Sequence, residues 1–532
     1  PSALPLLGTA LSMVRSEQTH GQYLANRQRW SKPITISETE LTFLGATASG
    51  VIQQKTGGHY PAPLAALELM LEASMLDLDA ALELEAERFA PLFGSPVNRA
   101  LLNVFFLTDR AKKTEVGRKP APLSRIGVVG AGTMGRGIAA ATARRGVGVT
   151  LCDSRADALA DGVSAVVTEA AYDRELKGPS ADRAADLAAL VDASIEPAAL
   201  GAADLVVEAI FEDAAAKRDL FAKIEPHAGD ETILCSNTST IPISTLAEGL
   251  ARPDRFCGLH FFNPVRKMPL VEVIRGSQTS DETIARATAF ARQIGKTPVV
   301  VADGPGFLVN RLLMPYLGEA TRLVEEGVPI RDIEKAAKRF GMPMGPITLQ
   351  DVVGLDVCLH AGRVMRQAFP DRVLESPLIA ALVDAGRLGQ KSGKGFFDYP
   401  PAKPGKPPKG ADSAEVVRIR NAACGGQSDT RAERVGSITD RLLLPMLVEA
   451  TRAIEDGIVR DARELDLAMI LGVGFPPFRG GLLFWADTVG AAAIAEKLRP
   501  LEALGPRYEV TGLLAEAAKA NASFYSLLNS SR

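Results

Sequence analysis

A glycine-rich turn between a strand pattern and a helix pattern limits the fold of this chain more than any other feature. The apolar run Ile126–Val129 leads into the sequence Gly-Ala-Gly-Thr-Met-Gly, and an alanine-rich helical pattern follows. At this spacing the first glycine permits a tight turn, the second lets the backbone approach a pyrophosphate, and the third allows close packing of helix on strand. The N-terminus of the following helix offers free N–H groups to an anion. We expect a dinucleotide to contact Gly130, Gly132, Thr133, Met134 and Gly135.

Further apolar runs alternate with helical patterns after this turn, at 147–152, 205–210, 232–235 and 299–301. Such alternation predicts βαβ units and a parallel sheet, that is, a Rossmann-type α/β domain. Asp153 ends the second run about 20 residues beyond the glycine turn, where a carboxylate can bind both ribose hydroxyls of NAD and would repel a 2′-phosphate. Arg155 lies close by and slightly weakens this discrimination.

An internal repeat follows this α/β region. Residues 310–327 match residues 440–457 at most positions without a gap, and looser echoes relate 341–343 to 474–476 and 351–354 to 487–490. A duplicated helical domain is the simplest explanation. Asn310 of the first copy is replaced by Asp440 in the second, so the first copy alone is a candidate for chemistry that needs an amide.

These patterns divide the 532 residues into five expected segments. A mostly helical N-terminal segment precedes the NAD-binding Rossmann domain, and the two repeated all-α domains, separated by a Pro- and Gly-rich linker, complete the chain. The expected ranges are 1–115 for the helical segment, 116–303 for the Rossmann domain, 304–400 and 430–532 for the helical domains, and 401–429 for the linker.

Composition removes several classes of function. The formal net charge of −3 gives no electrostatic reason to expect nucleic acid or an anionic membrane surface as partner. No apolar run reaches the roughly 18–20 residues that span a bilayer, and the first residues lack the pattern of a secretory signal. The five cysteines are scattered without a Cys-x-x-Cys pair, which argues against a zinc site or a disulfide framework and fits a reducing compartment.

A metal-free enzyme that transfers hydride from an alcohol needs a base with a pKa near the working pH, and histidine is the usual residue. Of the five histidines, His260 lies in a predicted strand beyond the nucleotide-binding core. Glu272 is an isolated carboxylate in the apolar strand 270–274, and burying it unpaired would be costly. Two adjacent strands joined by a short loop could place Glu272 beside His260, where it would fix the imidazole tautomer. From these residues alone, a purely structural His–Glu pair remains the alternative.

The sequence resembles the L-3-hydroxyacyl-CoA dehydrogenase family in the motifs 236–239 (SNTS), 259–264 (LHFFNP), 270–274 (LVEVI), 304–311 (GPGFLVNR) and 389–399 (GQKSGKGFFDY). The resemblance implies that His260 is the base and Glu272 its partner, and that Ser239 and Asn310 hydrogen-bond the reacting oxygen. It implies helical domains like that of 6-phosphogluconate dehydrogenase. It also implies cofactor contacts by Glu208, Lys217 and Asn263, although the lysine common in the family seven residues after the glutamate is Ala215 here.

The order of the segments is similar to the α-subunit of the bacterial fatty-acid oxidation complex and its mitochondrial and peroxisomal relatives. This resemblance implies oxidation of an L-3-hydroxyacyl-CoA thioester by NAD in β-oxidation, with a thiolase subunit as partner. The expected location is the cytoplasm in a bacterium, or mitochondria or peroxisomes in a eukaryote. Most of the enoyl-CoA hydratase domain that such subunits carry first is missing here. The resemblance implies that residues 1–115 hold the tail of that domain and a linker helix, and we expect the full-length protein to have hydratase activity as well.

Two alternatives stay open. Another β-hydroxyacid dehydrogenase would act on a free acid, more often with a lysine base. A vestigial scaffold subunit of a β-oxidation complex would need a degraded site, whereas every expected catalytic position here is filled. Single-chain relatives pair two helical domains by dimerisation, so the second copy is expected to supply that partner surface internally, with one active site per chain.

Overall fold

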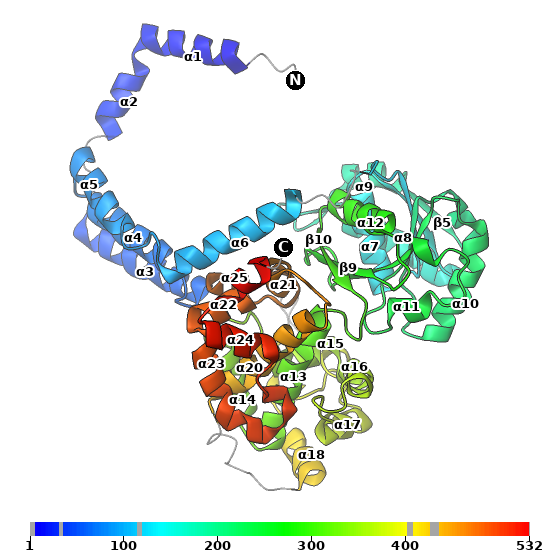
Figure 1. The fold of residues 1–532 in the computed structure, drawn as a ribbon. Helices are drawn as coiled ribbons and strands as arrows, with labels where there is room; N and C mark the ends of the chain where they lie inside the picture. The colour runs from blue at the N-terminus through cyan, green and yellow to red at the C-terminus, as the bar shows by residue number, and fades with distance from the viewer. Residues whose placement is uncertain (1–5, 31–35, 114–119, 402–407, 426–435, 531–532) are drawn as a thin grey trace. The chain divides into compact units, whose positions relative to one another are not determined.

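The computed structural model describes residues 6–30, 36–113, 120–401, 408–425 and 436–530. The chain divides into two compact units after Leu101, and each is described by itself (Figure 1). Two expected boundaries, after residue 115 and after residue 429, lie within the ranges 114–119 and 426–435, which are outside the described residues.

The N-terminal unit is helical, as the sequence predicts. Ser37 begins α3 with a capping box, since its side chain accepts a hydrogen bond from the N–H of Glu40 while the Glu40 carboxylate accepts one from the N–H of Ser37. Pro61 occupies the first turn of α4, where the missing N–H costs nothing. The helices are α1 (Leu6–His20), α2 (Gln22–Trp30), α3 (Glu38–Thr56), α4 (Pro61–Ala73) and α5 (Leu78–Phe89), and α6 (Pro96–Lys113) continues into the second unit.

An eight-stranded sheet forms the first part of the second unit, in the order β10-β9-β8-β7-β6-β1-β2-β5. All neighbours are parallel except β8 and β9, which pair antiparallel. The order therefore reverses between β1 and β6, the switch point where α/β sheets bind their ligands. The strands are β1 (Arg125–Val129), β2 (Gly148–Cys152), β5 (Val191–Ser194), β6 (Leu205–Glu208), β7 (Ile233–Ser236), β8 (Phe256–Phe261), β9 (Leu270–Arg275) and β10 (Thr297–Ala302).

Helices connect these strands and bury the apolar side chains of the sheet. Ile126 and Val128 of β1 and Leu205 and Val207 of β6 are fully buried in this core, as continuous apolar strands of a covered parallel sheet must be. The helices are α7 (Thr133–Ala143), α8 (Ala156–Ala170), α9 (Ala181–Ala188), α10 (Ala214–Ile224), α11 (Ile243–Leu246) and α12 (Asp281–Gln293), with a small hairpin of β3 (Tyr172–Asp173) and β4 (Gly178–Pro179).

Two helical copies complete the fold and confirm the internal repeat. The first has α13 (Val309–Glu325), α14 (Ile330–Phe340), α15 (Pro346–Val353), α16 (Leu355–Ala368) and α17 (Pro377–Asp384). The second has α20 (Ile438–Glu455), α21 (Ala462–Ala468), α22 (Leu482–Val489), α23 (Ala491–Leu498), α24 (Gly512–Ala520) and α25 (Phe524–Ser530). Glu334 accepts hydrogen bonds from the first N–H groups of α15, and Asp466 does the same for α22.

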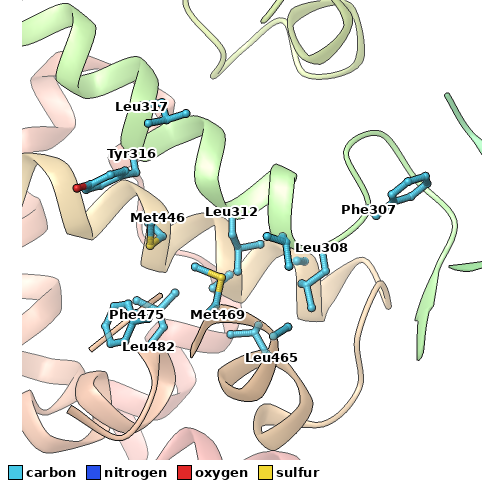
Figure 2. Close-up of a cluster of buried hydrophobic side chains, with 14 of the residues drawn as sticks. Phe307, Leu308, Leu312, Tyr316, Leu317, Met446, Leu465, Met469, Phe475 and Leu482 are labelled. Atoms are coloured by element: carbon cyan, nitrogen blue, oxygen red, sulfur yellow. The ribbon is translucent and has the colours of Figure 1, made fainter. Parts of the chain in front are cut away.

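The two copies face one another through α13 and α20. Figure 2 shows Leu308, Leu312 and Tyr316 of the first copy beside Met446, Leu465, Met469, Phe475 and Leu482 of the second, in one buried cluster. Arg311 binds Glu449 at 2.7 Å, and Arg441, the equivalent of Arg311, binds Glu319, the equivalent of Glu449. Each copy thus offers the same arginine and glutamate to the other, as in an isologous dimer interface.

Part of the segment 401–429, expected to be a linker, is folded. Strand β12 (Ala411–Asp412) pairs antiparallel with β11 (Phe397–Asp398), and helix α18 (Ala414–Cys424) packs on α17. The helix is held because Val416 is buried and Arg387 binds Glu415 at 2.7 Å. Residues 402–407, the centre of the proline-rich stretch, lie outside the described residues.

Among the described helices, none is both long and apolar enough to cross a bilayer. Within the same residues, no cluster of three or more His, Cys, Asp or Glu side chains is arranged to hold a metal ion.

Candidate active site

The glycine turn after β1 has the geometry that a dinucleotide loop needs. Gly130 has a φ of +104°, and a Cβ on it would lie 2.6 Å from the carbonyl oxygen of Ala209. A Cβ on Gly135 would lie 1.8 Å from the carbonyl oxygen of Gly130. At Gly132, by contrast, no described residue has an atom within 4 Å of such a Cβ. The outer glycines are therefore required by the fold, whereas Gly132 leaves space in front of the helix.

Helix α7 begins at this space and no described side chain caps it, so the N–H groups of its first turn face the open space. Asp153, just after β2, accepts hydrogen bonds from the N–H groups of Ala131 at 2.8 Å and Arg155 at 3.0 Å. Its carboxylate is fixed beside the glycine turn, is partly exposed, and retains lone pairs for a ribose. These features fit the nucleotide that the sequence predicts.

Glu208 and Lys217 form an ion pair beneath the site. Glu208 ends β6 and is fully buried, Lys217 is 1% exposed, and Nζ lies 2.5 Å from Oε1. The hydroxyl of Ser236, at the end of β7, donates to the other oxygen of Glu208 at 2.5 Å. The pair joins the ends of β6 and β7 at the switch point. Their contact with a cofactor stays a prediction.

Glu212 is a residue of the site that sequence reasoning missed. One of its oxygens accepts hydrogen bonds from the hydroxyl of Thr238 at 2.7 Å and from the N–H groups of Ser239 and Thr240 at 2.9 and 3.2 Å. Lys217 lies 3.3 Å from its other oxygen. Burial acts to raise the pKa of Glu212, but the Lys217 charge and these hydrogen bonds together lower it below its ordinary value. Glu212 thus organises the loop that carries Ser239.

His260 and Glu272 are direct cross-strand partners on β8 and β9. Nδ1 of His260 lies 2.8 Å from Oε2 of Glu272, with the two residues 6% and 0% exposed. Oε1 of the same carboxylate accepts hydrogen bonds from the N–H groups of Leu308 at 3.1 Å and Val309 at 2.9 Å, at the start of α13. Glu272 therefore holds the histidine ring and the first turn of the helical copy with one carboxylate.

Two aromatic rings enclose His260. The centroid of Phe262 lies 4.5 Å from the imidazole centroid, and that of Phe307 lies 5.8 Å away. Phe307 has a φ of +51°, a strained backbone for a residue with a bulky side chain. Such strain concentrates at functional sites, because the surrounding structure must hold it in place.

Ser239 and Asn310 meet across the two parts of the unit. The side-chain amide of Asn310, in the first turn of α13, donates to the carbonyl oxygen of Ser239 at 3.2 Å. In the second copy the equivalent Asp440 binds Lys497 at 3.0 Å on the surface. Asn310 and Asp440 match in the repeat, but Asn310 contacts the loop of Ser239 whereas Asp440 pairs with a surface lysine.

Two family models match the chain: the NAD binding domain of 3-hydroxyacyl-CoA dehydrogenase over residues 125–304, and its C-terminal domain over residues 306–399. This chain belongs to the 3-hydroxyacyl-CoA dehydrogenase family. It is accordingly an NAD-dependent oxidoreductase, and NAD is the cofactor that the glycine turn fits. The matched ranges end at Tyr399, before the second helical copy.

Solved structures place the chain in the same family. It is similar to 3-hydroxybutyryl-CoA dehydrogenase from Escherichia coli K12, with 29% identity, a TM-score of 0.64, and coverage of 75% of this chain and 99% of that one. (S)-3-hydroxybutyryl-CoA dehydrogenase PaaH1 from Ralstonia eutropha is 39% identical, with a TM-score of 0.50 and coverage of 52% and 100%. The dehydrogenase part of multifunctional enzyme 1 from C. elegans is 26% identical, with a TM-score of 0.54 and coverage of 78% and 96%.

In this member of the family, the expected base and its partner are in contact, and the expected serine and asparagine are in contact with one another. Asn263 is exposed in the loop after β8 and precedes a cis proline. Lys296 holds this loop by donating to the carbonyl oxygens of Val265 and Met268, and burial lowers its pKa to about 8. A cofactor contact by Asn263 stays a prediction.

Proposed function

We propose that the chain oxidises L-3-hydroxyacyl-CoA to 3-oxoacyl-CoA in fatty-acid β-oxidation, with His260 as the general base. One observation carries the proposal: the buried contact of His260 with Glu272, close to the contact of Ser239 with Asn310 at the edge where the parallel strands end. A surface histidine would have no fixed ring, and a core histidine would have no polar groups beside it for a substrate oxygen.

His260 would take the hydroxyl proton on Nε2, because Nδ1 faces the Glu272 carboxylate. The negative charge of Glu272 would then stabilise the imidazolium and hold the ring in place. NAD, when bound at the glycine turn, supplies the acceptor for the hydride from the substrate carbon. Ser239 and Asn310 would donate to the substrate oxygen as it becomes a carbonyl, an electrostatic contribution that grows along the reaction. Phe307 and Phe262 would exclude water from the imidazole.

The five segments 1–115, 116–303, 304–400, 401–429 and 430–532 are proposed as its domain organisation. The first helical domain would cover the acyl thioester, and the second would supply internally the surface that a partner subunit provides in dimeric relatives. The reciprocal pairs of Arg311 and Arg441 support this part, because they have the symmetry of a dimer interface within one chain.

A hydratase activity in the full-length protein and a thiolase partner belong to the same proposal, as does a cytoplasmic location in a bacterium or a mitochondrial or peroxisomal one in a eukaryote. They rest on the order of the segments and on the likeness to the dehydrogenase part of a multifunctional enzyme. The alternative of a free β-hydroxyacid as substrate is less favoured, because such enzymes more often use a lysine base and the buried group positioned here is a histidine.

The test is NADH formation, followed by absorbance, with L-3-hydroxybutyryl-CoA, its D isomer and free L-3-hydroxybutyrate. We expect turnover of the L thioester alone. Turnover of the free acid at a comparable rate would support the β-hydroxyacid alternative. No turnover of any of the three, nor of L-3-hydroxydecanoyl-CoA, would support a vestigial subunit.

A further inference from the structure

A cleft lies in the first helical copy, between α13, α16 and α17, with a free volume of about 120 Å³. Apolar side chains dominate its wall, among them Met314, Leu317, Leu359, Met365, Phe369 and Ile379. Pro445 of α20 contributes to it from the second copy. We call it the α13/α16 cleft.

Two glycines inside helices keep this cleft open. Gly318 lies within α13 and Gly362 within α16, and both line the cleft. Gly318 is exposed, and outside its own helix backbone no described residue has an atom within 4 Å of a Cβ on it. Gly362 is half-buried, and a Cβ on it would only reach normal contact with Met314, at 4.0 Å. Neither glycine has a positive φ. Glycine inside a helix is destabilising relative to alanine, so these positions lose stability without a backbone or packing need. What they provide is empty space.

The second helical copy is an internal control. Gly318 corresponds to Val448 in the ungapped part of the repeat. Helices α16 and α23 are equivalent, and both have a glycine N-cap, Gly354 and Gly490. Aligned on these caps, Gly362 corresponds to Leu498. Val448 and Leu498 are fully buried. The same helix pair is filled in the copy that carries Asp440 and hollow in the copy that carries Asn310. The space is therefore not a requirement of the fold.

The cleft runs along the helix that begins with Asn310, although His260, Ser239 and Asn310 are not among its lining residues. Leu317 and Thr321 lie two and three turns after Asn310 on the same side of α13, and both line the cleft. Met365, also in the wall, lies so close to Gly306 that a Cβ there would be 2.9 Å from Sδ. Gly306 precedes Phe307, whose ring contacts His260. Gly306 thus lies between Met365 of the cleft lining and Phe307, the aromatic residue next to His260.

Most of the charges around the cleft are paired, although its lining holds six arginines and four glutamates. Glu449 binds both Arg311 and Arg372, at 2.7 and 2.8 Å, and Glu325 lies 3.3 Å from Arg322. Arg366 and Arg507 of the lining also have carboxylate partners, whereas the exposed Arg363 has no ion-pair partner among the described residues. The apolar wall between these ion pairs fits an uncharged, flexible apolar chain.

We propose that the α13/α16 cleft binds the acyl chain of the substrate beyond the carbons that react, and that its two glycines set the chain length the enzyme accepts. This rests on the proposed function, because it assigns the thioester substrate to the same site. The chain is an unbranched saturated one, longer than the butyryl group.

The test is to fill the cleft with the side chains of the second copy, as Gly318→Val and Gly362→Leu. Steady-state kcat/KM is measured for L-3-hydroxybutyryl-CoA and L-3-hydroxydecanoyl-CoA. Since each buried methylene contributes about fourfold in affinity, displacing two or more should lower kcat/KM for the decanoyl substrate about tenfold or more, chiefly through KM. The butyryl substrate should change less than about twofold, because it lacks the methylenes concerned. Gly50→Val is the matched control: Gly50 lies inside α3, no described residue is within 4 Å of its Cβ position, and neither substrate should be affected.

Equal losses for both substrates, or an unchanged decanoyl rate, would overturn the proposal. Binding of free decanoate tests whether the cleft holds a separate ligand or the acyl chain of the substrate. If calorimetry shows decanoate binding to the NAD complex, and Gly318→Val abolishes that binding without changing decanoyl-CoA kinetics, the cleft serves another molecule and the assignment is wrong. Absence of turnover of both CoA substrates by the unmodified enzyme would instead refute the proposed function itself.

Discussion

Glu272 Oε2 lies 2.8 Å from Nδ1 of His260, and Oε1 of the same carboxylate holds the first turn of α13. The orientation of the imidazole and the seating of the helical copy on the sheet therefore depend on one buried side chain. Asn310 lies in that same turn. The proposed base and the proposed oxygen-binding amide are thus fixed relative to one another through Glu272.

Replacing Glu272 with glutamine should lower kcat by about 10²–10⁴-fold, because the amide cannot stabilise an imidazolium as a carboxylate does. The side chain keeps an oxygen for the α13 N–H groups, so the fold should survive. Steady-state kinetics, with circular dichroism and NAD titration as controls, measure this. A rate within about tenfold of the unmodified enzyme would mean that Glu272 is only structural.

Alanine at Gly132 and at Gly135 should separate cofactor binding from folding. Gly132→Ala places its methyl group in open space and should change the free energy of unfolding by less than about 0.5 kcal/mol. NAD affinity should nevertheless fall about tenfold or more, as expected for loss of one hydrogen bond to a charged group. Gly135→Ala should destabilise the apoprotein by at least about 1–3 kcal/mol, since its Cβ meets a backbone carbonyl. Equal thermal shifts for both variants would contradict this assignment.

Asn310→Asp and Asp440→Asn form a matched pair in the two helical copies. The first should reduce kcat/KM by about 10²–10³-fold, because a donor to the substrate oxygen becomes an acceptor. The second should leave kcat/KM within about twofold and lower stability by at most about 1 kcal/mol, the usual value of a surface pair such as Asp440–Lys497. A large kinetic effect at Asp440 would show that the second copy takes part in catalysis.

Arg441 is fully buried, and its partner Glu319 is 1% exposed at the side chain. Arg441→Met should destabilise the protein by about 3–5 kcal/mol, because it removes a buried cation from Glu319 and leaves that carboxylate with Arg507 alone, at 3.0 Å. The double variant Arg441→Met with Glu319→Met should lose less free energy of unfolding than the two single variants together. The difference, measured by urea unfolding in a double-mutant cycle, should be about 0.5–3 kcal/mol. Simple additivity would mean that this reciprocal pair does not couple the two copies.

The sequence allowed the alternation of strands and helices to be predicted, because continuous apolar runs between glycines and helical patterns have few other solutions. The neighbourhood of His260 and Glu272 could also be predicted, since a short loop between two apolar strands leaves antiparallel pairing as the simplest arrangement. Likewise the repeat predicted two helical copies, and both are present.

Contacts between distant loops could not be predicted. Glu212 is bound by groups 26 to 28 residues further along the chain, and nothing in its own surroundings marks it. The sequence held one indication of this contact. Glu212 is an acid just before a helix, and residues 238–240 form a serine- and threonine-rich loop whose N–H and hydroxyl groups need acceptors. The second role of Glu272 depends on the packing of α13 against the sheet, which no local pattern encodes. Helix α18 was hidden by the proline-rich stretch that precedes it.

The rate of the His260→Gln variant with L-3-hydroxybutyryl-CoA and NAD tests the central claim most directly. Glutamine keeps a polar side chain of similar reach but cannot accept the hydroxyl proton at neutral pH. With NAD affinity unchanged, kcat should fall by about 10²–10⁴-fold, the usual contribution of a general base. A kcat within about tenfold of the unmodified enzyme would show that His260 is not the base.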